Sequence, residues 1–440
     1  MKRAIILILA LLSVAPLPSA AIAGEGAGAP PTRLTLDAAL RRALEVNNQV
    51  EQSRREVQAA EANRGYLLSQ VMPHIAINGN LQRNSIERTF GEGANAVTIL
   101  PANNWNYSIT LQQPLFAGLR EQRAYSQAKL GVENAVQDTR ETEDQTLLRV
   151  ASSFLGLVNA DARMDVERKN IELAENRRKQ AQAFYEAGEV TKVDVLRAET
   201  AIQASQRALA AAQQARDTAE SDLRAALDLD GPIEAVPQKQ QLPPVPDEAT
   251  LVAHAEARRP DVQVASNNVR IASLEVAKQR GFWLPTLAFN GGLINQKSAF
   301  PAQNYTFGAL QFSIPVFQSG EVQNRVAGAK AREYEARVGL DTMKVTARED
   351  VRKALAARRA AATSLVLARE QLAAAEAEYA QTFELYRAQE ATSLDLSTSE
   401  ASLADARRAV AEETLNHDLA ELRVWFAAGD IKQAVGVQNQ

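Results

Sequence analysis

Two long stretches of the chain carry apolar and small residues at steps of three and four positions. The first runs without a proline from Phe116 to about Tyr185, and the second runs from Glu321 to about Tyr386. Such steps place the apolar residues on one face of a helix. Each stretch therefore predicts a helix of about 65 residues, which is about 100 Å long. Because few helices of globular proteins exceed about 25 residues, these helices need a coiled-coil-like partner.

Four short segments alternate apolar and polar residues with a period of two, which is the pattern of a β-strand. They are residues 75–81, 104–112, 287–293 and 305–314. In 104–112 every odd position is apolar or aromatic, as expected for a strand with one apolar face and one face toward water. The fourth segment changes phase after Tyr305 and Phe307, which predicts a bulge near Gly308.

These strands fit either a membrane or a soluble setting. Trp105, Tyr107, Tyr305 and Phe307 are candidates for aromatic residues at a membrane interface. The same alternation fits a soluble pair of β-hairpins packed on the helices. Four strands cannot close a transmembrane barrel, for which about eight is the smallest number. A place in the membrane would therefore require several copies of the chain.

Much of the chain is a tandem repeat. Residues 185–199 and 386–400 share Tyr, Ala, Glu, Thr, Asp and Glu in one register, 201 positions apart. Pro114 and Pro315 are also 201 positions apart, whereas Pro73 and Pro285 are 212 apart, so the first half has an insert of 11 residues. We expect residues 24–229 and 248–427 to form two structural repeats of one domain. Each repeat should contain, in order, a helix, two strands, a long helix and a final helix.

Three further segments lie outside the repeats. Residues 1–23 contain Lys2 and Arg3, an apolar run and a stretch of small residues, which predicts a secretory signal peptide. Residues 230–247 are rich in proline and glycine and predict a surface linker. Residues 428–440 form a C-terminal tail.

The composition excludes several kinds of site. The chain has no cysteine, which excludes disulfides, thiol nucleophiles and iron–sulfur clusters. Its three histidines, His74, His254 and His417, are far apart and show no metal-binding spacing. With 49 basic and 53 acidic residues, the net charge of −4 gives no reason to expect nucleic acid as a partner. No nucleophile, phosphate-binding or zinc-protease motif is found, so we expect neither enzyme activity nor a cofactor.

The two long helices are each interrupted at matching positions. Residues 187–189 (Ala-Gly-Glu) end the first, and residues 388–390 (Ala-Gln-Glu) take the same place in the second. Gly188 can supply the positive φ that a turn requires. The breaks are either ordinary hairpin tips or a functional end of the molecule. Their shared register with Asp194 and Asp395 favours the second interpretation.

Taken together, these features resemble the TolC family of outer-membrane channel and efflux proteins. The resemblance rests on the repeat and on residues 34–40 (Leu-Thr-Leu-Asp-Ala-Ala-Leu), 114–118 (Pro-Leu-Phe-Ala-Gly) and 187–196 (Ala-Gly-Glu-Val-Thr-Lys-Val-Asp-Val-Leu). It implies a mainly α protein with a small transmembrane β part. In a homotrimer, each protomer would give four strands to one twelve-stranded outer-membrane barrel and its helices to a long α-helical barrel. Residues 230–247 would be equatorial, and residues 428–440 equatorial or disordered.

The resemblance also implies a function. The protein would be a passive exit duct of a tripartite efflux pump or type I secretion system, in the outer membrane of a Gram-negative bacterium with most of the chain in the periplasm. Its partners would be further copies of itself, a periplasmic adaptor protein, an inner-membrane transporter and outer-membrane lipid. The alternative is a soluble periplasmic coiled-coil scaffold or adaptor protein.

The resemblance assigns roles to residues near the two breaks. Asp194 and Tyr386 match a closed-state tether, a tyrosine hydroxyl bonded to a carboxylate. Asp395 matches an acidic ring at the pore constriction, where repulsion between copies should raise its pKa. Thr398 and Ala391 stand where the family's best-known member has an acidic and a basic residue, which predicts a closure that is looser or that relies on other contacts. Adaptor docking is expected at Ala187, Gly188, Glu189, Thr191, Ala388, Gln389, Glu390 and Thr392.

Overall fold

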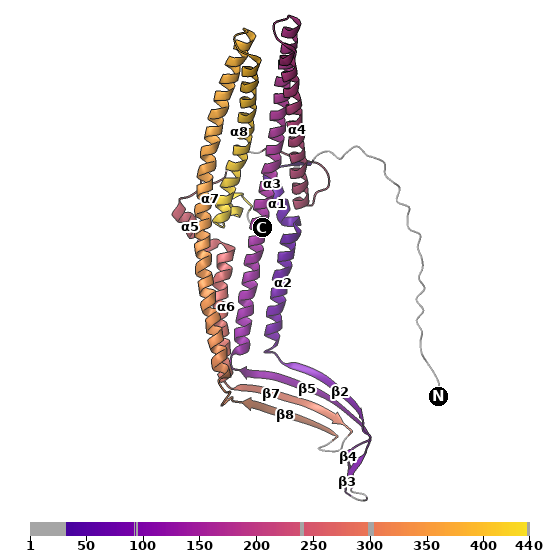
Figure 1. The fold of residues 1–440 in the computed structure, drawn as a ribbon. Coiled ribbons are helices and arrows are strands. Elements are labelled where there is room, and N and C mark those ends of the chain that lie inside the picture. Colours follow the sequence, from indigo (N-terminus) through magenta and orange to yellow (C-terminus); the bar gives the residue numbers. More distant parts are fainter. Residues whose placement is uncertain (1–31, 92, 94–95, 238–241, 298–302, 438–440) are drawn as a thin grey trace, which may run out of the picture.

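The computed structural model describes residues 32–437, apart from 92, 94–95, 238–241 and 298–302. The expected signal peptide at 1–23 lies outside the described residues, as do 238–241 of the expected linker and 438–440 of the expected tail. The molecule is long and narrow, with two helical hairpins at one end and a curved sheet at the other (Figure 1). None of the described helices is both long and apolar enough to cross a membrane.

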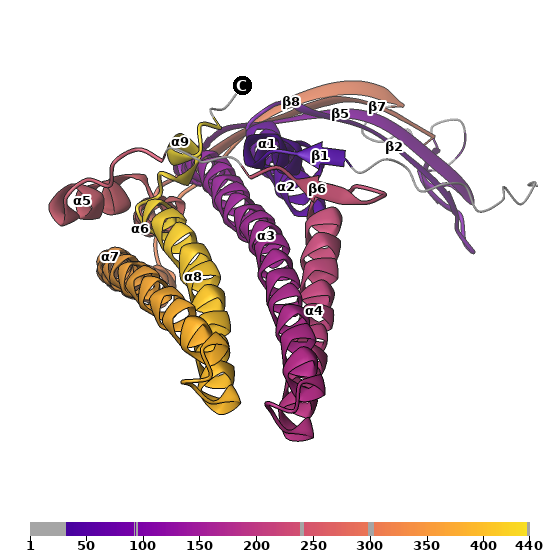
Figure 2. The same cartoon turned by 90° about the horizontal axis from the view of Figure 1, so that it is seen from above.

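Two helices of 67 residues run through most of the molecule. They are α3 (Arg120–Glu186) and α7 (Glu321–Arg387), and they confirm the long helices predicted from the apolar pattern. Each turns back into a shorter helix, α4 (Lys192–Leu227) or α8 (Ser393–Ala427). The two resulting hairpins stand beside one another (Figures 1 and 2).

Each half opens with two helices, where the sequence predicted one. They are α1 (Leu36–Val46) and α2 (Asn48–Ser69) in the first half, and α5 (Glu248–Arg258) and α6 (Pro260–Arg280) in the second. The first break is at Asn47, whose side chain accepts a hydrogen bond from the backbone amide of Gln49 at 3.0 Å and caps α2. The second precedes Pro260, which has no amide hydrogen to continue α5.

Corresponding helices of the two halves begin at matching positions. The starts of α1 and α5 are 212 residues apart, and so are those of α2 and α6. The starts of α3 and α7 are 201 residues apart, and so are those of α4 and α8. These are the two spacings of the sequence landmarks, so the repeat extends to the bounds of the helices.

The main sheet contains the four strands predicted from alternation, which are confirmed. They are β2 (His74–Arg83), β5 (Asn103–Ala117), β7 (Thr286–Gln296) and β8 (Asn304–Ser313). All neighbours are antiparallel, in the order β2-β5-β7-β8. The strands of the two halves therefore meet between β5 and β7, and β2 and β8 are the edges of the sheet.

The bulge predicted near Gly308 is wrong. The pairing of β7 with β8 is continuous along the whole of β8. Tyr305 and Phe307 therefore lie on the face opposite Leu310 and Phe312, because successive side chains of a strand alternate between faces. A bulge is present instead in β5, just after Pro114, which cannot donate a hydrogen bond to a neighbouring strand.

Several smaller elements were not predicted. β1 (Thr32–Leu34) pairs in parallel with β6 (Ile233–Ala235), and β3 (Arg88–Phe90) pairs with β4 (Val97–Leu100) beyond the main sheet. A 3-10 helix, η2 (Gly281–Trp283), follows α6, and α9 (Ile431–Ala434) lies near the end of the chain. Because β6 and α9 are packed in the core, parts of the expected linker and tail are ordered structure.

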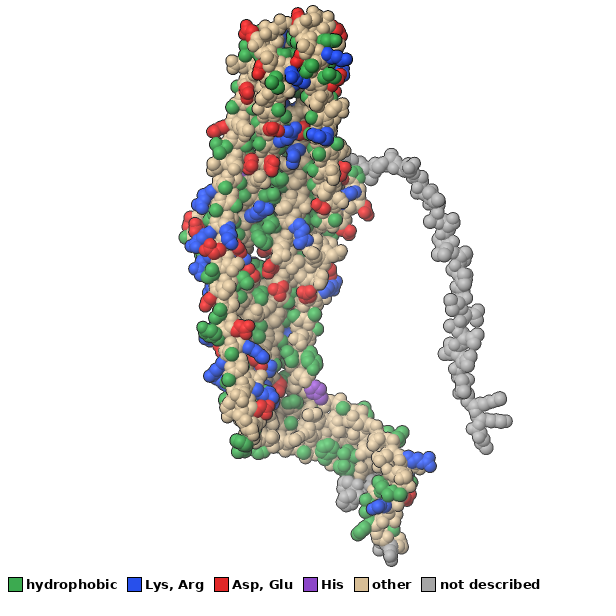
Figure 3. All heavy atoms as spheres, viewed as in Figure 1, with side chains coloured by type: hydrophobic (Ala, Val, Ile, Leu, Met, Phe, Trp, Pro, Cys, Tyr) green, Lys and Arg blue, Asp and Glu red, His purple; other side chains and the backbone are tan. Residues whose placement is uncertain are grey.

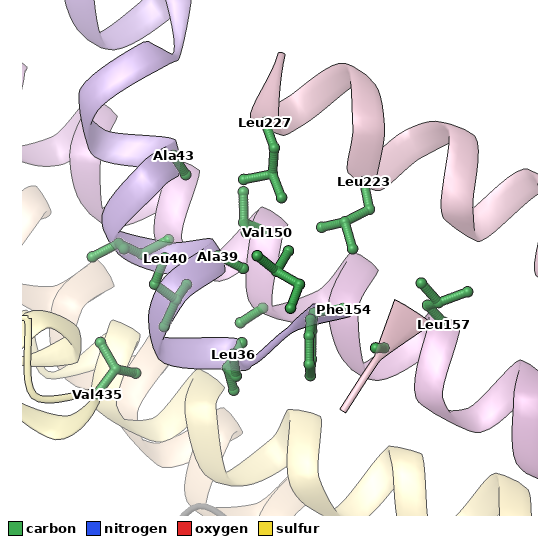
Figure 4. Packing of buried hydrophobic residues seen from close by; sticks show 14 of the residues in the cluster. Leu36, Ala39, Leu40, Ala43, Val150, Phe154, Leu157, Leu223, Leu227 and Val435 are labelled. Carbon is green, nitrogen blue, oxygen red and sulfur yellow. The ribbon is translucent and has the colours of Figure 1, made fainter. Parts of the chain in front are cut away.

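The largest hydrophobic cluster lies where α1, α3 and α4 meet β6 and α9. Its fully buried side chains include Leu40, Phe154 and Leu223, which come from α1, α3 and α4 (Figure 4). Burying one such side chain contributes about 1.5–3 kcal/mol. The cluster fixes the first half around the middle of α3, and leaves the hairpin tips and the sheet as the two free ends of the molecule.

Candidate functional site

The tips of the two helical hairpins are built by the same local device. α4 and α8 each begin with a capping box, formed by Thr191 with Asp194 and by Thr392 with Asp395. The threonine amide donates to the aspartate carboxylate, at 3.1 Å for Asp194 and 2.9 Å for Asp395. A capping box satisfies amide groups that the first turn of a helix leaves without partners. Asp194 and Asp395, which occupy matching positions of the repeat, therefore stabilise the starts of α4 and α8.

The turns at the tips are exposed and touch one another. Gly188 has a φ of 76° and Gln389, in the matching position, a φ of 61°, which is uncommon for a residue other than glycine. The side-chain amide of Gln389 donates to Glu189 Oε2 at 2.7 Å. The residues expected to dock an adaptor are all exposed: Ala187, Gly188, Glu189, Thr191, Ala388, Gln389, Glu390 and Thr392.

Asp194 and Tyr386 lie in the same tip region, but the hydrogen bond expected between them is not formed. Asp194 accepts from the hydroxyl groups of Ser393 and Thr191. Tyr386 is 4% exposed and packs against Phe184, with ring centroids 5.9 Å apart. Within the described residues its hydroxyl has no hydrogen-bond partner. Asp194 thus joins α4 to α8 through Ser393 rather than reaching Tyr386 on α7.

The environment keeps the Asp194 carboxylate ionised and the Tyr386 hydroxyl neutral. Burial alone would raise the pKa of Asp194, but hydrogen bonds from Ser393 and Thr191, assisted by Arg197, outweigh it and lower the pKa. Burial raises the pKa of Tyr386, and the nearby carboxylate of Asp194 raises it further. At neutral pH, Asp194 is therefore ionised and Tyr386 is neutral.

A buried arginine joins the two hairpins further from the tips. Arg177 on α3 is 3% exposed, and its Nη1 donates to Glu400 Oε2 on α8 at 2.6 Å. Its Nη2 donates to the carbonyl of Ser393 at 3.0 Å. Burial raises the pKa of Glu400, although Arg177 acts against this shift. Arg177 and Ser393 were missed in the sequence; the position of Glu400 at the end of the repeated motif was the one available signal.

Asp395 and Thr398, the expected constriction residues, are exposed at the start of α8. Hydrogen bonds from Thr392 lower the pKa of Asp395 in the single chain. This direction is opposite to the one expected from repulsion, which requires neighbouring copies of Asp395. The hydroxyl of Thr398 donates to the carbonyl of Leu394 at 2.9 Å, within its own helix.

The described residues contain no group of three or more histidine, aspartate or glutamate side chains arranged to hold a metal ion. Two of the three histidines lie beside carboxylates instead. His254 Nδ1 is 2.7 Å from Asp430 Oδ2, and His417 Nδ1 is 3.2 Å from Asp418 Oδ1. These contacts join α5 to the C-terminal segment and stabilise α8 locally.

The other end of the molecule is a sheet with an exposed apolar face. Ile77 on β2 lies opposite Ile109 on β5, which lies opposite Leu293 on β7, so all three share this face. Further exposed residues of the same face are Ile75, Leu81, Tyr107, Leu310 and Phe312. Charged side chains are spread over the helices but are few on the visible part of the sheet (Figure 3).

The four candidate interfacial aromatics divide between the two faces of the sheet. Trp105 and Tyr107 lie on the apolar face, with ring centroids 5.5 Å apart. Tyr305 and Phe307 lie on the other face, opposite Ile294 and Gly292. The apolar face therefore carries only one of the two candidate pairs, Trp105 with Tyr107.

Known proteins are similar to this chain over most of its length. Residues 39–228 and 251–430 match the family described as outer membrane efflux protein. The outer membrane efflux protein BepC of Brucella suis biovar 1 (strain 1330) is 23% identical over 391 residues, which cover 88% of this chain and 82% of BepC. The structure of CusC aligns with a TM-score of 0.78 at 17% identity, over 90% of this chain and 92% of CusC. The CmeC outer membrane channel of Campylobacter jejuni aligns with a TM-score of 0.77 at 17% identity, over 90% of this chain and 86% of CmeC.

Proposed function

Because the chain belongs to the outer membrane efflux protein family, we propose that it forms the passive outer-membrane exit duct of a tripartite efflux pump or type I secretion system. The resemblance to TolC-family channels is confirmed by this membership, and the protein is an outer-membrane protein of a Gram-negative bacterium. The observation that carries the proposal is a sheet with an exposed apolar face at one end of helices about 100 Å long (Figure 1). Such helices reach far from a sheet held in the membrane.

The duct is proposed to be a homotrimer. The main sheet has four strands in one chain, and a closed transmembrane barrel needs about eight or more. Three copies supply twelve strands around one axis, with their apolar faces toward outer-membrane lipid. The helices of the three copies then surround the continuation of the same pore.

The exposed tips are proposed to receive a periplasmic adaptor protein, through which an inner-membrane transporter delivers substrate. Exposure of residues 187–189, 191, 388–390 and 392 supports this role. The tips would also form the gate, with Asp395 and Thr398 at the constriction. Asp194 would hold the closed state through its hydrogen bond from Ser393, and Tyr386 through its packing on Phe184. Such a duct needs no cofactor and carries out no reaction.

Conductance in planar lipid bilayers tests the proposal. The full mature chain, extracted with detergent from outer membranes and reconstituted, should give discrete single-channel currents. The same preparation should appear in the outer-membrane fraction of cells. Recovery of the chain in the soluble periplasmic fraction, without any channel activity, would support the scaffold alternative instead.

A further inference from the structure

The internal repeat determines how the two edges of the sheet fit one another. In the proposed barrel, the two edge strands that meet between copies are β8 of one copy and β2 of the next. We infer that they pair in a register that places Leu310 opposite Leu81 of the next copy. The inference rests on the proposed assembly for the presence of neighbouring copies. It adds which residues of the two edges face each other.

The strand hairpins of the two halves have the same register. Adding 212 to β2 and 201 to β5 converts each pair of the first hairpin into a pair of the second. Ile75 opposite Leu111 becomes Leu287 opposite Phe312, and both pairs are observed. The same rule converts the pairs of Ile77 and Leu81: they lie opposite Ile109 and Trp105, and Phe289 and Leu293 lie opposite Leu310 and Thr306.

The two halves of one chain meet where β5 pairs with β7. Since β8 corresponds to β5 and β2 corresponds to β7, the joint between two copies should repeat the joint within one. Ile109 lies opposite Leu293 in the chain, which translates into Leu310 opposite Leu81. Two further observed pairs, Gln113 with Phe289 and Phe116 with Leu287, translate into Ile314 with Ile77 and Phe317 with Ile75.

The chemistry of the two edges agrees with this register. The translated pairs on the apolar face include Leu310 with Leu81, Phe312 with Gly79 and Ile314 with Ile77, and Arg83 at the end of β2 meets Gly308. On the other face, Gln311 meets Asn80 and Ser313 meets Asn78, so polar side chains meet polar side chains. A slip of one residue would turn every side chain of one strand to the wrong face. A slip of two residues would keep the faces, so it has to be separated by experiment.

The exposure of the β8 end fits a neighbouring strand at this edge. Phe116 at the end of β5 is half-buried, whereas the corresponding Phe317 is 85% exposed. β5 continues to Ala117, but β8 ends at Ser313. We expect residues 314–318 to continue β8 when β2 of the next copy lies beside them, with a bulge at Val316 in place of the one at Leu115.

Cysteine cross-linking tests the register, and the absence of native cysteines makes every disulfide an introduced one. The full chain with Leu310→Cys and Leu81→Cys, oxidised in outer membranes, should shift to reducible dimer and trimer bands. Leu310→Cys combined with Gly79→Cys or with Arg83→Cys is displaced by two residues, or about 7 Å along the strand. These slipped variants should remain mostly single chains, because a disulfide requires Cα atoms within about 7 Å.

Two controls keep the outcome decisive. Ile77→Cys with Ile109→Cys is a pair within one chain and shows that oxidation reaches this part of the sheet. Ile314→Cys with Ile77→Cys tests the same register independently, in case one double variant fails to assemble. Stronger linkage of a slipped pair, or none between copies while the internal pair links, would overturn the register. Conductance of the unmodified chain tests the proposed duct independently. The proposed register can therefore be wrong even if the chain forms a channel.

Discussion

Arg177 and Glu400 form an ion pair between the two helical hairpins, with 2.6 Å between Nη1 and Oε2 and side chains 2% and 11% exposed. The same guanidinium holds the carbonyl of Ser393, whose hydroxyl donates to Asp194. One arginine of α3 therefore supports the start of α8 and, through it, the contact with α4. A buried charge is costly without its partner. Loss of one member of this group should therefore weaken the other contacts as well.

We expect Arg177→Met to loosen the tips, because it leaves the Glu400 carboxylate buried without its cation. Breaking one side of a buried ion pair costs about 3–5 kcal/mol. Hydrogen exchange of the amides in residues 386–400 should become faster. The double variant Arg177→Met with Glu400→Leu should recover most of the protection, since no unpaired charge remains.

The matched control is Arg168→Ala on the same helix. Arg168 pairs with Asp165 at 2.9 Å, but the two side chains are 59% and 67% exposed. Exposed pairs contribute about 0–1 kcal/mol, so exchange at the tips should stay close to that of the unmodified chain. Equal exchange in Arg177→Met and Arg168→Ala would show that the buried pair does not hold the hairpins.

Tyr386→Phe should leave the closed state intact, because the hydroxyl that it removes has no hydrogen-bond partner among the residues that the structure describes. Asp194→Ala should open the gate, because it removes the acceptor of the Ser393 hydroxyl and one side of a capping box. The measurement is single-channel conductance of each variant in planar bilayers. A rise in conductance for Tyr386→Phe would restore the tether expected from the family resemblance, and place the hydroxyl in contact with a neighbouring copy.

The sequence predicted the parts of this fold that depend on local patterns. Steps of three and four residues gave α3 and α7, and alternation gave the four strands. Contacts between distant positions left no such pattern: Arg177 and Glu400 are 223 residues apart. β1 and β6 are three residues each and pair across about the same separation. The phase change in β8 was misread as a bulge, because apolar residues on both faces of a strand look like a shift in register.

Gly118→Ala should disrupt the junction between the sheet and α3. Gly118 has a φ of 67°, and an added Cβ would lie 2.2 Å from the carbonyl oxygen of Gly281. Both the backbone conformation and the clash act against a side chain. We expect a large loss of protease-resistant protein in the outer membrane. Gly131→Ala is the control, since no described residue outside its own helical turn lies within 4 Å of the added Cβ and alanine favours a helix interior. Equal losses in the two variants would contradict the argument.

Asp144 should make the centre of the molecule more stable in mild acid. Burial raises the pKa of Asp144 to about 6, although Lys432 and Arg140 oppose the shift. An acid with a raised pKa in the folded protein contributes stability at low pH that is lost as the pH rises through about 6. A shift of this size corresponds to roughly 3 kcal/mol.

Asp144→Asn imitates the protonated form, so it should be more stable than the unmodified chain at pH 7.5. This difference should close as the pH falls below about 6, as measured by thermal unfolding in detergent. Asp165→Asn, which changes a carboxylate that is 67% exposed, should give no such pH-dependent difference. A constant difference between Asp144→Asn and the unmodified chain at all pH values would show that Asp144 titrates in the ordinary range.

Asp395→Asn should weaken the preference of the channel for cations. Three copies of an exposed carboxylate around a narrow opening attract cations and repel anions, and the amide keeps the size of the side chain and can still accept from the Thr392 amide. The measurement is the reversal potential in planar bilayers with unequal salt on the two sides. Asp405→Asn is the matched control, because Asp405 is 72% exposed on the same helix but lies about 15 Å further from the tip. An unchanged reversal potential in Asp395→Asn, or an equal change in both variants, would show that Asp395 does not line the constriction.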